Sequence, residues 1–128
     1  MVRFYAKAAG ITIVLIGIGG LLLGNEPLFD VLNIDLSEDA IHLVTGGAMA
    51  GAGFFARDVR VVRAVVGGLG VVYLLVGILG IFEPRMFGLI PHGYDTVLDN
   101  LIHLALGVLG IAVAYAPQSQ SEARHPAG

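Results

Sequence analysis

Four long runs without a charged residue are the feature that most limits what this chain can fold into. The runs cover residues 8–25, 40–56, 64–82 and 100–120, and the last one fades at Pro117. Each is close to the roughly 20 residues that an α-helix needs to cross the hydrocarbon core of a bilayer. With 56% hydrophobic and only 13% charged residues, the chain leaves no water-soluble domain outside these runs. The sequence therefore predicts an all-α, polytopic membrane protein with four transmembrane helices.

The basic residues indicate which way the helices insert. They lie before the first helix, in the middle connection and in the tail, namely Arg3, Lys7, Arg57, Arg60, Arg63 and Arg124. Only Arg85 falls in one of the two outer connections, which are otherwise acidic. The positive-inside rule then places both termini in the cytoplasm. A net charge of -3 and an acidic outer face exclude nucleic acid as a partner, so we expect the lipid bilayer, and other membrane subunits or self-association, as the partners.

An internal repeat divides the chain into two halves. An offset of 57 residues pairs Arg3 with Arg60, and after a four-residue insertion an offset of 61 pairs His42 with His103. Each unit contains two helices, so both copies insert the same way up, as parallel repeats related by an axis along the membrane normal. The prediction is a bundle at 1–116, with repeat one at 3–56 and repeat two at 60–116, followed by a disordered cytoplasmic tail at 117–128.

Small residues describe how the helices are expected to pack. Three small-x-x-x-small patterns favour close approach of helix backbones, namely Gly20-x-x-x-Gly24, Gly47-x-x-x-Gly51 and Ala64-x-x-x-Gly68. Each repeated histidine also begins a stripe of mostly small residues on one helix face, with successive spacings of 4, 3 and 4 residues. The first stripe is His42, Gly46, Met49 and Gly53, and the second is His103, Gly107, Gly110 and Ala114. In an up-and-down bundle the second and fourth helices are diagonal. We therefore expect His42 and His103 to face each other at one depth, near the outer face.

One interpretation of this pair is a tetrapyrrole site. Two neutral imidazoles on diagonal helices can ligate one haem iron axially, which assigns the axial positions to His42 and His103. Gly46 and Gly107 lie one turn deeper and would clear space for the flat macrocycle.

Three other interpretations fit the same residues. Glu38 lies four residues before His42 and Asp99 four before His103, so two carboxylates and two imidazoles could surround a divalent metal ion. A histidine that titrates near neutrality also suits a proton carrier. In the third interpretation the histidines only form structural hydrogen bonds, with Asp39, Asn100 or backbone groups, and they fix the outer ends of the bundle.

The second histidine motif resembles a known family. Asn100, His103, Leu104 and Gly107 fit the Asn-x-x-His-Leu-x-x-Gly element near the start of the last helix in domain-of-unknown-function family 4383, which comprises small bacterial four-helix membrane proteins. The first copy departs from the element, because Asp39 stands where the second has Asn100. The resemblance implies the fold, the topology and a bacterial inner membrane, and it supplies no activity.

No motif indicates catalysis. The chain has no cysteine, no nucleophile beside a base and no nucleotide-binding loop after a strand. The sequence therefore favours a non-catalytic, structural or accessory membrane protein without a cofactor, as a subunit of a larger membrane complex. The alternatives are a haem or other tetrapyrrole protein and a proton or metal-ion carrier.

Overall fold

The computed structural model describes residues 1–23, 36–83, 85, 87 and 97–117. Its helices are α1 (Val2–Leu23), α2 (Leu36–Phe55), α3 (Val59–Phe82) and α4 (Val97–Tyr115), and the described part of the chain contains no strand. The predicted all-helical fold with four helices is thus confirmed. Outside the described residues lie Gly24 with the first outer connection, most of the second outer connection, and the tail beyond Pro117.

Three of the helices are long and apolar enough to cross a membrane. These are α1, α3 and α4, with 22, 24 and 19 residues. Helix α2 matches them in length with 20 residues, but it is less apolar because its first two turns carry Glu38, Asp39 and His42. Three of the four expected spans thus have the length and composition that a membrane crossing requires, and α2 falls short because of the residues that the sequence marks as a candidate site.

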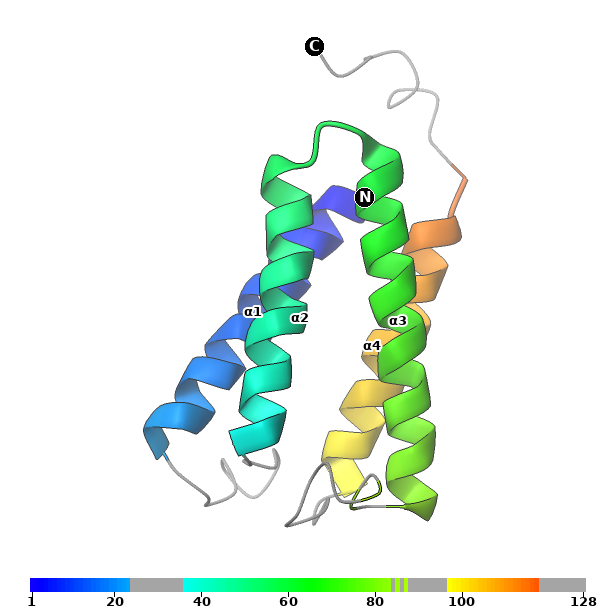
Figure 1. The fold of residues 1–128 in the computed structure, drawn as a ribbon. Helices are drawn as coiled ribbons and strands as arrows, with labels where there is room; N and C mark the ends of the chain where they lie inside the picture. Colours follow the sequence, from blue (N-terminus) through cyan, green and yellow to red (C-terminus); the bar gives the residue numbers. More distant parts are fainter. Residues whose placement is uncertain (24–35, 84, 86, 88–96, 118–128) are drawn as a thin grey trace.

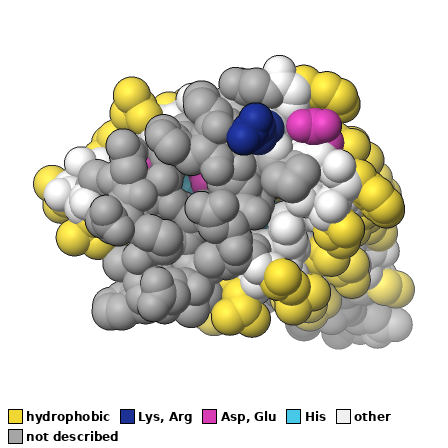
Figure 2. Space-filling model, turned by 90° about the horizontal axis from the view of Figure 1, so that it is seen from below, with side chains coloured by type: hydrophobic (Ala, Val, Ile, Leu, Met, Phe, Trp, Pro, Cys, Tyr) yellow, Lys and Arg dark blue, Asp and Glu magenta, His cyan; other side chains and the backbone are white. Residues whose placement is uncertain are grey.

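The helices form two hairpins that stand side by side. Successive helices alternate in direction, and the start of α1 lies at the same end as the end of α4 (Figure 1). Helix α1 packs along α2 and α3 packs along α4, whereas contacts between the hairpins are sparser. Seen from the end where α2 and α4 begin, hydrophobic side chains border much of the described part (Figure 2).

Glycines bring the two helices of each hairpin into backbone contact. A Cβ atom built on Gly46 would lie 2.8 Å from the backbone nitrogen of Val14 in α1. One built on Gly107 would lie 2.5 Å from the backbone nitrogen of Leu74 in α3. Neighbouring backbone cannot yield as a flexible side chain can, so only glycine fits both positions without moving a helix.

Two of the three small-x-x-x-small patterns, those that contain Gly47, Gly51 and Gly68, are not where this close packing occurs. A Cβ atom on Gly47, Gly51 or Gly68 would meet nothing within 4 Å, and Gly20 packs against the Asp39 carboxylate. The expectation that these patterns join helices of the chain is therefore wrong for those three glycines. Successive residues of a helix are about 100° apart, so the face beside a packed glycine points outward.

The buried positions of the two hairpins correspond with an offset that differs, for the first helix of each, from the offset of the sequence repeat. Buried positions of α1 recur in α3 after 60 residues, as in Val2 and Val62, Ala6 and Val66, Gly10 and Gly70, Ile13 and Tyr73, Gly17 and Gly77, and Gly20 and Gly80. Those of α2 recur in α4 after 61, in agreement with the sequence. The sequence offset of 57 for the first helix of each hairpin is thus short by three residues, close to one helical turn.

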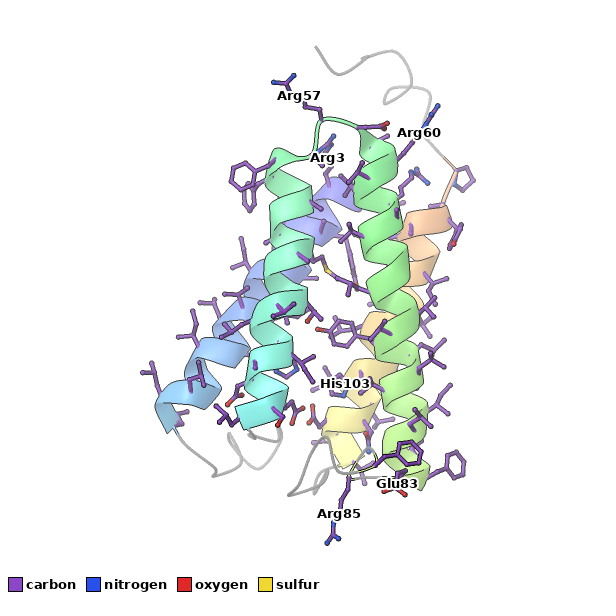
Figure 3. The ribbon with its side chains drawn as sticks, viewed as in Figure 1. Arg3, Arg57, Arg60, Glu83, Arg85 and His103 are labelled. Carbon is purple, nitrogen blue, oxygen red and sulfur yellow. The ribbon has the colours of Figure 1, made fainter. Side chains whose placement is uncertain are left out.

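Two arginines hold the ends of α2 and α4. The Arg3 guanidinium donates hydrogen bonds to the carbonyl oxygens of Ala56, at 2.7 Å, and Arg57, at 2.8 Å. Arg63 donates in the same way to Ala114, at 2.7 Å, and Ala116, at 2.9 Å. Figure 3 shows Arg3, Arg57 and Arg60 at one end of the bundle and Glu83 and Arg85 at the other. Each hairpin therefore has an arginine that satisfies carbonyl groups at or just beyond the end of its second helix.

Candidate functional site

The buried polar side chains of the described residues gather at one end of the bundle. They are Glu38, Asp39 and His42 from α2 and Asp99, Asn100 and His103 from α4, and we call these six residues the polar centre. His103 lies in the half of the bundle away from Arg3, Arg57 and Arg60 (Figure 3). The centre is formed by the first two turns of two helices that belong to different hairpins.

Local sequence explains why these side chains lie together. Glu38, Asp39 and Asp99 fall in the first turns of their helices, where a carboxylate interacts favourably with the positive end of the helix dipole. Residues four apart share a helix face. Glu38 therefore lies on the same face as His42, and Asp99 on the same face as His103.

The two histidines meet across the gap between the hairpins. Their ring centroids are 6.1 Å apart with an interplanar angle of 32°, and the exposed fractions of the residues are 7% for His42 and 3% for His103. The expectation that the pair would face each other agrees with this geometry. Any group that both imidazoles contact would join one hairpin to the other.

Three of the four predicted metal ligands come together. Glu38, His42 and His103 each offer a ligand atom, and these three atoms all lie within 4.8 Å of one another. Asp99 lies beside this trio, with its Oδ1 atom 4.0 Å from Nδ1 of His103. Glu38, His42 and His103 are thus candidate ligands of one metal ion, whereas Asp99 lies next to the ligand His103.

Tyr73 and Thr45 belong to the site although the sequence analysis missed them. The Tyr73 ring stacks on His103 with centroids 5.7 Å apart, and its hydroxyl lies 2.6 Å from Oγ1 of Thr45. The Thr45 hydroxyl donates its one hydrogen bond to the carbonyl oxygen of Ile41, at 2.8 Å. The Tyr73 hydroxyl is therefore the donor in its hydrogen bond with Thr45. A tyrosine in the middle of an otherwise apolar span is the sequence signal that could have identified it.

One imidazole nitrogen stands out in the polar centre. Nδ1 of His42 has no hydrogen-bond partner among the described residues, although it is fully shielded from solvent. Leaving such a buried polar atom unsatisfied costs about 1–3 kcal/mol. Native structures rarely keep this cost without a compensating role.

Gly46 and Gly107 do not open space around the histidines. Gly46 packs against the backbone of α1 and Gly107 against the backbone of α3, because each hairpin packs more closely within itself than against the other. The room that the haem interpretation assigned to these glycines is therefore occupied by neighbouring helices.

Comparison with known proteins adds no further information about this site. A scan against protein-family models and searches of the curated proteins and of the solved structures found no match. The chemistry of the site consequently follows from its geometry.

Proposed function

We propose that this chain is a small, non-catalytic integral membrane protein with a structural or accessory role, as a subunit of a larger membrane complex. The position of the polar centre carries the proposal. Its six side chains are buried, and the histidine pair joins the two hairpins, so the centre serves the interior of the bundle. The outward side chains of all four helices include many large apolar ones, such as Leu15, Val44, Leu75 and Leu109. Such a surface suits contact with lipid and with other membrane helices.

The proposed topology has four crossings and two parallel repeats, with both termini in the cytoplasm. Helix α2 crosses beside α1, its closest partner. The matching burial of α1 with α3 and of α2 with α4 supports the repeat, as do the similar contacts of Arg3 and Arg63 with carbonyls near the ends of α2 and α4. Arg57 and Arg60 lie at the end that we assign to the cytoplasm.

Membership of family 4383 and a bacterial inner membrane remain part of the proposal. The residues that carry the resemblance have clear structural positions, because Asn100 and His103 are buried in the polar centre and Gly107 contacts α3. The motif therefore describes how α4 is anchored in the bundle.

Isolation of the chain from its own membrane tests the accessory role. An affinity-tagged chain would be extracted with a mild detergent and weighed by native mass spectrometry. The expected result is a complex that holds a second protein in fixed stoichiometry, while the same chain made in an unrelated host has no such partner. A monomer or homo-oligomer from both membranes would contradict the proposal.

The paired histidines keep haem binding as a second candidate. Protein purified from haem-replete cells would show a Soret band that disappears in His42→Ala and in His103→Ala if both imidazoles ligate the iron. The contacts at Gly46 and Gly107 favour the opposite result, a colourless and folded protein, which would end the haem hypothesis.

A proton or ion carrier has less support from the geometry. Transport across a bilayer needs polar groups at several depths. The buried Asp, Glu and His side chains of the described residues all lie in the first two turns of α2 and α4, at one end of the bundle.

A further inference from the structure

We propose that Glu38, His42 and His103 form a binding site for a divalent transition-metal ion such as Zn²⁺, and that the ion is held between the two hairpins. Two imidazoles and one carboxylate are a common ligand set for zinc. All three residues are buried, with exposed fractions of 2%, 7% and 3%. The site goes beyond the accessory role, because it can exist whether or not the chain joins a complex.

The distances between the ligand atoms are close to those that a metal ion requires. In a tetrahedral site with bonds of about 2.1 Å, the ligand atoms are about 3.4 Å apart. The three atoms here lie within 4.8 Å of one another. Small rotations of the side chains, chiefly that of the long glutamate, are therefore enough to bring them together around an ion.

The unpartnered nitrogen of His42 is a second and independent indication. Its Nδ1 atom is shielded from solvent and has no hydrogen bond within the described part of the chain. A neutral imidazole needs an acceptor for its N–H and a partner for its lone pair. A metal ion bound to one ring nitrogen satisfies the lone pair that the bundle itself does not.

The ligand types and their charge set the selectivity. Imidazole nitrogen suits zinc, cobalt, nickel and copper, whereas magnesium and calcium prefer sites made entirely of oxygen. Glu38 and the adjacent Asp99 are both 2% exposed, and their two carboxylates would balance the charge of a divalent ion. The site should thus discriminate strongly against Mg²⁺ and Ca²⁺.

Asp99 is assigned as a positioning residue. Its Oδ1 atom lies 4.0 Å from Nδ1 of His103, so a movement of about 1 Å would form a hydrogen bond. In metal sites a carboxylate often accepts the second N–H of a ligating histidine and fixes the ring that binds the metal. This assigns Nε2 of His103 to the ion, while the stacked ring of Tyr73 limits rotation of the imidazole.

Metal titration of the purified full chain tests the site. The protein would be stripped with a chelator in detergent and titrated with Zn²⁺, Co²⁺ and Mg²⁺. We expect one equivalent of Zn²⁺ to raise the melting temperature, Co²⁺ to give visible ligand-field bands that Zn²⁺ abolishes, and Mg²⁺ to have no effect. A stripped protein that neither gains stability from Zn²⁺ nor develops Co²⁺ bands would overturn the proposal.

Variants separate the site from adventitious binding. His42→Ala and His103→Ala should each abolish the Co²⁺ bands. If an alanine variant does not fold, Glu38→Gln tests the site instead, because it keeps the shape of the side chain. Glu83→Gln, in the helix-capping residue at the same end, should bind as the wild type does. Equal Zn²⁺ affinity in all of these variants would mean an adventitious ion only.

The role of Asp99 has its own readout. Asp99→Asn should lower Zn²⁺ affinity by 10–100-fold while the Co²⁺ bands persist at saturation. A purely structural role would instead lower the melting temperature of the metal-free protein and leave the affinity unchanged. These measurements use the isolated chain, so their failure is distinguishable from failure of the accessory role, which is tested by the mass of the complex.

Discussion

At the scale of single residues, adjacent glycines in α2 have opposite surroundings. A Cβ atom on Gly46 would meet the α1 backbone at Val14, whereas one on Gly47 would meet nothing within 4 Å. The histidine stripes in the sequence identify Gly46 and Gly107 as inward, and both are buried. The small-x-x-x-small pattern instead predicts that Gly47 is a contact position. This prediction fails because the spacing of small residues does not say which face of a helix meets a neighbour.

This contrast predicts the effect of one added methyl group. Gly46→Ala should destabilise the bundle by about 1–3 kcal/mol, the usual cost of overpacking a well-packed interior. Gly47→Ala adds the same methyl group on an open face and should be neutral or stabilising by up to about 1 kcal/mol, because alanine favours a helix. Denaturant unfolding in detergent compares the two, and equal losses of stability would show that Gly46 is not a contact position.

At the scale of elements, the register of α3 against α1 decides which arginine holds the end of a helix. Basic and glycine residues recur three apart in α3, as in Arg60 and Arg63 or Gly67 and Gly70. Offsets of 57 and 60 therefore both produce matches in the sequence. Arg63 contacts carbonyls at the end of α4 much as Arg3 contacts carbonyls just beyond α2, which favours the offset of 60.

The register makes a prediction about this arginine pair. Arg63→Ala should destabilise the protein by about 1.5–3 kcal/mol, since it removes hydrogen bonds from a charged donor to the end of α4. Arg60 is exposed, and Arg60→Ala should change stability by less than about 0.5 kcal/mol. Thermal unfolding in detergent measures both, and a larger loss in Arg60→Ala would support the offset of 57.

At the scale of the whole molecule, the protein consists of two tightly packed hairpins with sparser contacts between them. Several of the contacts between hairpins are polar, including the histidine pair, the hydrogen bond from Tyr73 to Thr45 and the 3.0 Å hydrogen bond from Tyr5 to the Leu106 carbonyl. Apolar attraction between helices is weak in lipid, so polar contacts have more influence on association. The polar centre is accordingly placed where it can control how the hairpins meet.

The proposed topology can be measured because the chain has no cysteine of its own. Arg57→Cys and Arg85→Cys each replace one exposed arginine, and they lie at opposite ends of the bundle. In intact cells, a membrane-impermeant maleimide should label Arg85→Cys at once, but Arg57→Cys only after the membrane is permeabilised. The reverse pattern would place both termini outside, and labelling of both would argue against a membrane-spanning orientation.

Sequence alone predicts the class of fold and the histidines and carboxylates of the candidate site, but not Tyr73 and Thr45. Uncharged runs of about 20 residues leave few structures other than membrane helices, and a repeated motif marks His42 and His103 because polar residues are costly in such helices. Which faces of the helices meet becomes apparent only in the folded structure. That structure gave α3 its register, directed Gly46 and Gly107 toward α1 and α3, and brought Tyr73 against His103. The physical reason is that helix formation and membrane insertion depend on local composition, whereas packing depends on the shapes of two surfaces that are distant in the sequence.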